Sequence, residues 1–280
     1  MKLQRLCPIK INLCLHIVQQ LPNGYHQLQT LFALLNWGDT LSIEAKPFAQ
    51  KHSGHNYSIS IQGMDDINPQ DNLIYKAIDA FIIEAGLSNI AVHAYINKVV
   101  PMGTGVGGGS SDAATALLIM NEIYNHPLSK QQLMHIAGKL GADVPVFIFE
   151  QHAWAESIGE ELEAFNLPEL SVLLAFPQEH VNTAAAFGNP DLKRDNGLLE
   201  KPDQNNWQKY THNHFEEVIR QMFPKIDHCF NILAPYGQPQ LSGTGSCVFL
   251  FSEDHSYIEN TYNTLRQKNS NIEFIITKTL

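Results

Sequence analysis

The stretch PMGTGVGGGSSDAA, residues 101–114, decides the fold, because it places five glycines within residues 103–109, directly before an alanine-rich helical segment. Glycine lets a backbone turn its N–H groups toward a ligand that meets no Cβ atom. When such a loop opens a helix, the unpaired N–H groups and the positive end of the helix dipole favour a phosphate. The stretch therefore predicts a phosphate-binding loop.

Two common phosphate-binding loops are disfavoured by what the chain lacks. A Walker loop ends in Gly-Lys-Ser/Thr, and this stretch contains no lysine. Gly103, Gly105 and Gly108 satisfy the G-x-G-x-x-G pattern of dinucleotide sites. The acidic residue expected about 20 positions later would be Glu122, which lies in the following helix and not at the end of a second strand. A Rossmann site is therefore disfavoured.

Length and composition indicate an ordinary globular protein with two domains. The chain has 280 residues, more than one hydrophobic core usually holds, and 44% of them are hydrophobic. No apolar stretch reaches the length of a transmembrane helix, and charges interrupt the N-terminal segment before a signal-peptide core could form. The four cysteines show no C-x-x-C spacing, so we expect reduced thiols. These features predict a cytoplasmic protein with no membrane partner.

Charge and histidine content exclude other classes of partner. A net charge of −10 disfavours a nucleic-acid-binding surface, but a helix N-terminus and a few lysines can still create a local positive field for phosphates. The histidine pairs His52/His55 and His212/His214 lie in polar, loop-like segments, and no H-E-x-x-H motif is present. We therefore predict no metal-ligand set among these histidines and disfavour a structural zinc site.

Strand-like segments come first and helical ones second, which predicts an α+β arrangement. Alternating or apolar segments predict strands over 9–17, 25–35, 40–45, 57–62 and 91–100, with a polar loop at 51–56. Helices are predicted over 72–85, 111–124 and, from the Ser129/Gln132 capping box, 129–141. The apolar run 144–149 is interpreted as strand-like or mixed. The pattern restarts near 156 with a strand at 170–176, an exposed linker or excursion at 193–208, a helix at 215–223 and a strand at 247–251.

Taken together, three separated features resemble the GHMP kinase superfamily: Lys10 and Asn12 on one face of the first strand, the glycine loop, and a second glycine turn at residues 241–246. The superfamily motif P-x-x-x-G-[LV]-G-G-G-S-S-[DN]-A-A is present from Pro101 to Ala114. The resemblance is greatest to members that act on a cytidine diphosphate derivative. The blocks that carry it are PIKINL (8–13), NGYHQLQTLF (23–32), DNLI (71–74), GADVPVF (141–147) and LSGTGSCVF (241–249).

The resemblance implies a two-lobed α+β fold, with an N-terminal nucleotide-binding lobe over 1–155 and a C-terminal ferredoxin-like lobe over 156–280. It implies transfer of the γ-phosphoryl group of ATP, with Mg²⁺, to the 2-hydroxyl of 4-diphosphocytidyl-2-C-methyl-D-erythritol, a step of the non-mevalonate isoprenoid precursor pathway. A mevalonate or homoserine type of kinase and a non-catalytic nucleotide-sensing relative remain alternatives. The oligomeric state, monomer or homodimer, stays open.

The resemblance also implies roles for particular residues. Asp143 is implied to receive or orient the hydroxyl proton, beside Lys10, which neutralises developing negative charge. Judged without the resemblance, Asp143 is typical of a turn or helix cap, and Lys10 of a strand lysine that faces water. The implied nucleotide-side residues are Asn72, Leu73, Lys98, Pro101, Gly103, Gly105, Gly107, Gly108, Gly109, Ser110 and Ser111. Of these, Asn72, Leu73 and Lys98 match the adenine-side pocket, and the two serines help hold Mg²⁺ or a phosphate or serve as N-caps. The implied acceptor-side residues are Tyr25 and Phe187, stacked on the cytosine, His26 at its edge, and Asn12 and Thr183 nearby.

Overall fold

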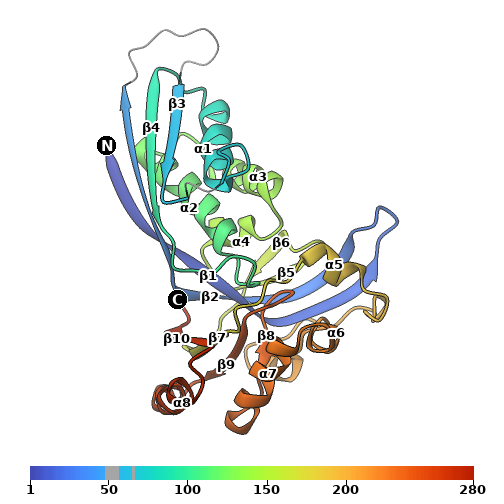
Figure 1. Cartoon of the computed structure of the whole chain (residues 1–280). Coiled ribbons are helices and arrows are strands. Elements are labelled where there is room, and N and C mark those ends of the chain that lie inside the picture. The colour runs from blue at the N-terminus through green and yellow to red at the C-terminus, as the bar shows by residue number, and fades with distance from the viewer. Residues whose placement is uncertain (48–56, 65–66) are drawn as a thin grey trace. The chain divides into compact units, whose positions relative to one another are not determined.

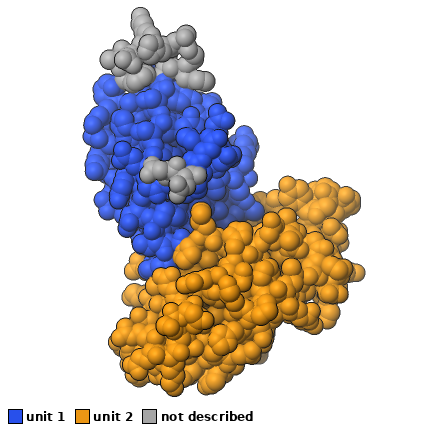
Figure 2. Space-filling view, viewed as in Figure 1, with its two compact units in different colours: residues 1–8, 37–100, 107–150 blue, residues 9–36, 101–106, 151–280 orange. Residues whose placement is uncertain are grey.

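The structure is a computed structural model that describes residues 1–47, 57–64 and 67–280 (Figure 1). The predicted loop at 51–56, with His52 and His55, lies outside the described residues. Figure 2 shows the chain divided into two compact units. Unit 1 comprises residues 1–8, 37–100 and 107–150, and unit 2 comprises residues 9–36, 101–106 and 151–280. Among the described residues, no helix combines the length and the apolar character needed to cross a membrane.

Two long strands contribute to both units, so each unit is discontinuous in sequence. They are β1 (Lys2–Gln20) and β2 (His26–Pro47), which pair with each other. Residues 9–36 and 101–106 therefore group with the C-terminal part of the chain, although they fall within the predicted domain 1–155. The ten-residue stretch 9–18 of β1 is buried on both faces, since polar as well as apolar positions lie below the surface.

Unit 1 is a small sheet with four helices. Its strands are the C-terminal part of β2, β3 (Tyr57–Gln62) and β4 (Ile90–Asn97); β4 pairs antiparallel with residues 40–47 of β2 and parallel with β3. Its helices are α1 (Leu73–Glu84), α2 (Gly108–Ile123), α3 (Lys130–Leu140) and α4 (Val144–Phe149). Helix α1 packs against β3, α2 and α3, and α4 packs against α2 and α3 (Figure 1). Helix α2 begins at Gly108, within the glycine-rich stretch.

Two local predictions in unit 1 had opposite outcomes. The capping box is confirmed: Ser129 accepts from the Gln132 backbone N–H and the Gln132 side chain accepts from the Ser129 N–H, at the start of α3. The strand-like interpretation of residues 144–149 is wrong, because these residues form α4. Pro145 lies in the first helical turn, where its missing N–H group breaks no hydrogen bond, so the proline is compatible with the helix.

Unit 2 contains a four-stranded antiparallel sheet in the order β10-β7-β9-β8. The strands are β7 (Ser171–Phe176), β8 (Gln240–Leu241), β9 (Val248–Ser252) and β10 (Glu273–Lys278). Between β7 and β8 lie α5 (Thr183–Gly188), η1 (Trp207–Tyr210), α6 (Glu216–Met222), α7 (Pro224–Leu233) and η2 (Ala234–Tyr236); α8 (His255–Lys268) lies between β9 and β10. This β-α-β-β-α-β order is ferredoxin-like, as expected.

The remaining strands of unit 2 belong to a different sheet. The N-terminal part of β2 pairs with β5 (Ala153–Glu156), which pairs with β6 (Glu161–Ala164). Residues 193–206 form no helix or strand, but they are fastened to the unit and do not form a free linker. Gln29 donates to the Leu199 carbonyl over 3.1 Å and accepts from its N–H over 2.8 Å. Trp207, at the end of the predicted linker, is buried.

Candidate active site

The second half of the glycine loop forms the start of α2 in unit 1. Gly107 is the N-cap residue, with a φ of 76°, a left-handed conformation that favours glycine. At Gly108, an added Cβ atom would lie 2.9 Å from Val100 Cγ1, so a larger residue requires a shift. The Ser111 hydroxyl oxygen is buried and has no hydrogen-bond partner among the described residues. A helix start of this kind offers N–H groups, a positive dipole end and a hydroxyl to an anion.

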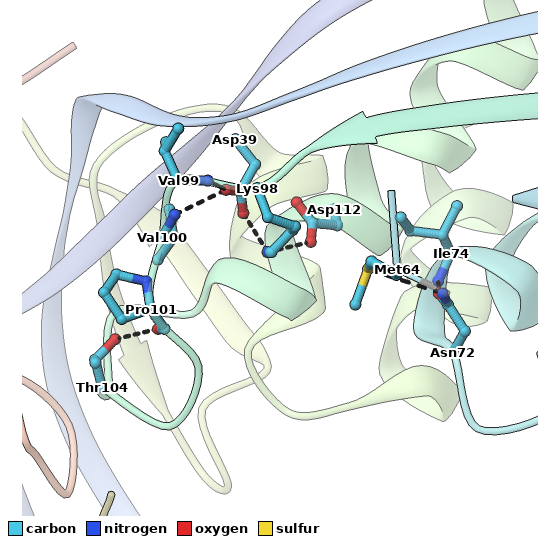
Figure 3. A network of polar contacts seen from close by, with 10 residues as sticks. All are labelled: Asp39, Met64, Asn72, Ile74, Lys98, Val99, Val100, Pro101, Thr104 and Asp112. Atoms are coloured by element: carbon cyan, nitrogen blue, oxygen red, sulfur yellow. Dashed lines mark hydrogen bonds and ion pairs between the residues drawn. The ribbon is translucent and has the colours of Figure 1, made fainter. Parts of the chain in front are cut away.

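Lys98 is held beside this helix start by two carboxylates (Figure 3). Its ammonium donates to Asp112 Oδ2 over 2.8 Å and also to Asp39. Asp39 Oδ1 accepts from the backbone N–H groups of Val99, over 2.6 Å, and Val100, over 2.9 Å. Asp39 is completely buried, so its carboxylate fixes both the lysine and the backbone that leads into the glycine loop.

Burial and charge oppose each other in this network. Burial raises the pKa of Asp112 to about 6, and the nearby Lys98 ammonium only partly offsets this increase. Burial also opposes the charge of Lys98, but Asp112 and Asp39 together raise the pKa of Lys98 above its ordinary value. Lys98 therefore remains an ammonium whose position is set by two carboxylates, neither of which sequence analysis identified.

Two of the three residues expected beside the adenine, Asn72 and Leu73, lie at the start of α1. Asn72 is the N-cap residue of this helix, and its Oδ1 accepts from the Ile74 N–H over 2.9 Å. Leu73 approaches the phosphate loop: a Cβ atom at Gly109 would lie 3.8 Å from Leu73 Cδ1. Ser110 is half-buried in the first turn of α2. Unit 1 thus brings together the start of α1 and the start of α2.

Lys10 is buried in unit 2, with a relative exposure of 2%, so the interpretation as a water-facing strand lysine is wrong. Its Nζ donates to Asn12 Oδ1 over 2.8 Å and to the Gly105 carbonyl over 2.9 Å. The ammonium also lies 5.5 Å from the centre of the Phe32 ring. Asn12 Oδ1 accepts a second bond from the Gly243 N–H over 3.0 Å. Lys10 and Asn12 therefore link β1 to both glycine-rich turns.

The two glycine-rich turns lie in backbone contact. The Ser242 hydroxyl donates to the Gly105 carbonyl over 3.0 Å, and the Cys247 N–H donates to the Thr104 carbonyl over 3.0 Å. Gly105 has a φ of 75°, and an added Cβ atom there would lie 2.2 Å from the Ser242 carbonyl oxygen. Because that neighbour is backbone, it cannot move aside like a flexible side chain. Residue 105 is therefore restricted to glycine both by conformation and by space.

The first half of the loop is shaped by neighbours within unit 2. Thr104 Oγ1 donates to the Pro101 carbonyl over 2.9 Å (Figure 3). Gly103 has a φ of 69°, and a Cβ atom there would lie 2.1 Å from His180 Cδ2. Pro101 therefore shapes the loop through its carbonyl group, and Gly103 through its backbone conformation.

His26 and Phe187, expected at the cytosine, lie together in unit 2. Their ring centres are 4.7 Å apart at an interplanar angle of 31°. The His26 Nε2 atom is buried and has no hydrogen-bond partner among the described residues. Burial, and secondarily the charge of Arg194, lower the pKa of His26, which favours the neutral ring. A neutral imidazole with an unsatisfied nitrogen is suited to hydrogen bonding with the edge of a polar ring.

The other acceptor-side residues differ in how exposed they are. Tyr25 is 61% exposed next to the turn that precedes β2. Thr183, at the start of α5, is exposed, and its hydroxyl lies 3.1 Å from that of Thr244 in the second glycine turn. Asn12 is buried, and its Nδ2 donates to Thr30 Oγ1 over 2.8 Å, so its amide group is engaged within the protein.

Asp143 lies at the N-cap position of α4 in unit 1, half-buried. Its side chain makes no capping hydrogen bond to α4. Asp143 belongs to unit 1 and Lys10 to unit 2, and their pairing stays a prediction.

Sequence analysis missed residues that hold the site together. Asp39 follows Gly38 within a long strand and has no motif around it. Asn213 donates from Nδ2 to the carbonyls of Leu241 and Gly243, both over 2.8 Å, and so braces the second glycine turn. Ser242 belongs to the sequence block 241–249, but its hydrogen bond to the Gly105 carbonyl could be found only from the fold.

Comparison with protein families finds two matches along this chain. Residues 72–151 match the family described as the GHMP kinases N terminal domain, and residues 184–271 match the GHMP kinases C terminal family. The first match covers α1 through α4, with Lys98 and Asp112 but without Asp39. The second covers α6 through α8 and includes strands β8 and β9 of the ferredoxin-like sheet.

Individual proteins are similar over most of their length. A 4-diphosphocytidyl-2-C-methyl-D-erythritol kinase of Pseudoalteromonas atlantica is 37% identical over 262 residues, which cover 92% of this chain and 87% of that protein. The enzyme of that name from Psychrobacter arcticus is 39% identical, covering 88% and 87%. A crystal structure of 4-(cytidine 5'-diphospho)-2C-methyl-D-erythritol kinase superposes with a TM-score of 0.81 at 27% identity, covering 99% of this chain and 100% of that one. A homoserine kinase of Cytophaga hutchinsonii, with a TM-score of 0.72 at 14% identity, shares the fold.

Proposed function

Because this chain belongs to the GHMP kinase family, we propose that it transfers the γ-phosphoryl group of ATP to the 2-hydroxyl of 4-diphosphocytidyl-2-C-methyl-D-erythritol and forms the 2-phosphate. Relatives with that name are 37% and 39% identical over about nine-tenths of the chain, whereas the homoserine kinase is similar only in fold. The predicted α+β GHMP kinase fold is confirmed. The chain is an ATP-dependent kinase of a small molecule, in the pathway to isoprenoid precursors.

The observation that carries the proposal is the convergence of Lys10 and Ser242 on the Gly105 carbonyl oxygen. It joins three separate blocks of sequence, the first strand, the glycine loop and the second glycine turn, at one atom. Phosphoryl transfer requires fixed positions for donor and acceptor and neutralisation of the negative charge that spreads in the transition state. The Lys10 ammonium is buried and held by a backbone carbonyl, so it can neutralise this negative charge from a fixed position.

Lys10 and Asp143 are proposed to act on the acceptor alcohol. Lys10 stabilises negative charge that develops on the attacking oxygen and on the transferred phosphoryl group. Asp143 accepts the proton of the 2-hydroxyl or orients that proton toward another acceptor.

The nucleotide is proposed to bind along the glycine loop and the start of α2. The N–H groups around Gly107, Gly108 and Gly109 hold phosphate oxygens, together with the positive end of the helix dipole. Asn72, Leu73 and Lys98 lie toward the adenine side, as the resemblance implies. Asn72 supports this side by capping α1, while Leu73 is close to Gly109.

Magnesium is proposed to accompany ATP, and the donors near the helix start suit it. Mg²⁺ prefers oxygen ligands and usually keeps several waters. The buried Ser111 hydroxyl oxygen, which has no partner among the described residues, and the half-buried Ser110 hydroxyl are the proposed protein contributions to the metal or to a phosphate. When bound, the ion offsets the charge of the phosphates.

The cytidine end of the acceptor is proposed to bind at His26, Phe187 and Tyr25. Phe187 and Tyr25 stack on the base, and the unsatisfied Nε2 atom of His26 bonds to its edge. Thr183 and Asn12 complete this side, Thr183 from an exposed position and Asn12 through its hold on Lys10. This set would not be needed by a mevalonate or homoserine kinase.

The proposal extends to the protein's setting. We expect a cytoplasmic enzyme, monomeric or homodimeric, with no nucleic-acid or membrane partner. The negative net charge and four buried free cysteines support this setting.

The experiment that tests the function is a coupled assay of ADP release with three acceptors, namely 4-diphosphocytidyl-2-C-methyl-D-erythritol, mevalonate and homoserine. We expect turnover with the first acceptor alone. Asp143→Ala should lose most turnover while ATP binding, measured by calorimetry, stays largely intact. Turnover close to that of the wild type in this variant would contradict the role of Asp143, and preference for another acceptor would contradict the substrate.

A further inference from the structure

Three histidines meet in unit 2 outside the residues assigned to the reaction. His16 lies on β1, and His212 and His214 lie between η1 and α6. One ligand nitrogen from each side chain can be chosen so that all three lie within 4.8 Å of one another. His16 is buried and the other two are half-buried. The cluster arises because Leu15 donates its N–H to the His212 carbonyl over 2.8 Å and accepts from the His214 N–H over 3.0 Å, which aligns the segment with β1.

Backbone carbonyls fix which nitrogen of two of these rings carries a proton. His16 Nε2 lies 2.9 Å from the Gly197 carbonyl oxygen, and His212 Nδ1 lies 2.8 Å from the Tyr210 carbonyl oxygen. A carbonyl oxygen only accepts, so each of these nitrogens must donate. In neutral rings, His16 Nδ1 and His212 Nε2 then carry only lone pairs, yet they face each other over 3.1 Å. Two lone pairs at this distance repel each other unless a cation lies between or beside them.

We propose that His16 Nδ1 and His212 Nε2 bind a divalent transition-metal ion of the zinc class, with the His214 ring as the third side of the site. Imidazole nitrogens suit zinc, copper and nickel, whereas magnesium and calcium prefer oxygen. The two backbone carbonyls that fix the tautomers are the outer partners usual for metal-binding histidines. This site is therefore chemically distinct from the magnesium that accompanies ATP.

His214 is less well placed to bind the ion than His16 and His212, because its Nδ1 atom is engaged within the protein. Its Nδ1 accepts from the Ile17 N–H over 3.1 Å and lies 3.2 Å from Asn196 Nδ2. Its ring centre lies 4.4 Å from that of His16 and 4.8 Å from that of His212. We expect water or a second external ligand to complete the coordination, with His214 shielding the ion.

The surroundings of the cluster suit a cation. Access is provided by a hollow of about 790 Å³ that His212 and His214 line. Its charged lining includes four carboxylates, which attract cations, and two basic side chains: Asp191, Glu216, Glu217, Asp227, Lys193 and Arg220.

The expected consequence is a firmer second glycine turn. Asn213 lies between His212 and His214 and holds the carbonyls of Leu241 and Gly243. An ion that joins His16 to His212 would tie this segment to β1. Because a ligand that binds only the folded state stabilises it, zinc should raise the melting temperature of the protein.

The test is zinc titration of the full chain after removal of metals with a chelator. Calorimetry should show one zinc per chain for the wild type. His212→Gln should weaken binding on the order of 100-fold, since even the loss of an outer partner commonly costs about 10- to 100-fold. His135→Gln, at an exposed position of α3, is the matched control and should bind zinc like the wild type.

Spectroscopy and stability separate a site from loose surface binding. Cobalt(II) bound to the wild type should give visible d–d absorption that His212→Gln lacks, and zinc should raise the melting temperature only in the wild type and in His135→Gln. Magnesium should not compete. Because His212 is half-buried, its variant is expected to fold, as circular dichroism would verify. Failure of the wild type to bind zinc at micromolar concentration, or equal binding by His212→Gln, would overturn the proposal.

Discussion

Asp39 offers the sharpest test of how the structure holds the start of the glycine loop. It is completely buried, and its carboxylate accepts from the Val99 N–H, the Val100 N–H and the Lys98 ammonium. Asp39→Ala removes all three acceptor contacts at once. We predict that this substitution lowers the free energy of unfolding by about 3–5 kcal/mol.

The magnitude follows from how well each donor can find another partner. Val100 is buried, and an unsatisfied buried N–H group costs about 1–3 kcal/mol. Lys98 keeps Asp112 at 2.8 Å, so it loses one charged hydrogen bond of two, which is worth about 1.5–3 kcal/mol. Val99 is 43% exposed, and its N–H group can bond to water, so it adds little.

Asp39→Asn is the control, because the amide oxygen can still accept from both backbone N–H groups while the charge is lost. We expect a decrease of about 1–2 kcal/mol for this variant. Urea unfolding followed by circular dichroism at pH 7 measures both decreases, and hydrogen exchange at the Val100 amide should accelerate only in Asp39→Ala. Equal destabilisation by the two variants, or a decrease below about 1 kcal/mol for Asp39→Ala, would refute the reasoning.

Three further outcomes are expected. Tyr25→Ala should raise the KM for the acceptor roughly 5- to 150-fold and leave that for ATP nearly unchanged, because one stacked base is worth about 1–3 kcal/mol; steady-state kinetics would show equal changes if the stacking assignment were wrong. Burial raises the pKa of Asp112 from 3.8 to about 6, so this group makes the free energy of unfolding fall as pH rises through that window. Urea titrations at several pH values should show that Asp112→Asn flattens the dependence of the unfolding free energy on pH. An unchanged dependence would contradict the raised pKa of Asp112. Gly105→Ala should destabilise the fold far more than Gly86→Ala, since both glycines have positive φ but only Gly105 would clash, with the Ser242 carbonyl, and similar melting temperatures would argue against that clash.

Features encoded within a few residues could be predicted from the sequence. The capping box at Ser129 and Gln132 was found because its partners are three residues apart, and both hydrogen bonds form at the start of α3. The glycine loop and the helix after it were located by composition, although α2 begins at Gly108, three residues earlier than expected. Local chemistry determines such features, so no knowledge of the tertiary fold was needed.

Short apolar runs and late elements were less predictable. The six apolar residues 144–149, five of them buried, carry no period that distinguishes a strand from a helix. Their packing against α2 and α3 favours the helix. Helices α7 and α8 and strand β10 were not predicted. Helix α8 is largely polar, with Ile258, Thr261 and Leu265 as its buried residues, so its apolar face is narrow.

Contacts between distant residues account for what the sequence could not predict about the site. Lys98 was identified, but the partner Asp39 lies 59 residues away and no motif connects the two. His16 is separated from His212 by 196 positions, so the spacing rules for metal ligands could not detect the pair. These partners become neighbours only through the antiparallel pairing of β2 with β4 and the alignment of residues 212–214 with β1.

The glycines within residues 101–109 are needed for packing inside the protein as well as for binding phosphate. At Gly105 the atom that excludes a side chain is the Ser242 carbonyl oxygen, not a ligand, and at Gly243 it is the Gly105 carbonyl oxygen, which would lie 2.9 Å from an added Cβ atom. This close approach allows one carbonyl to accept from both Lys10 and Ser242. The Lys10 ammonium is held by a backbone atom, the Gly105 carbonyl oxygen. Its position therefore depends more on the conformation of the two glycine turns than on any one side chain. The requirement for glycine at 105 and 243 is therefore also a requirement for placing the charge of Lys10.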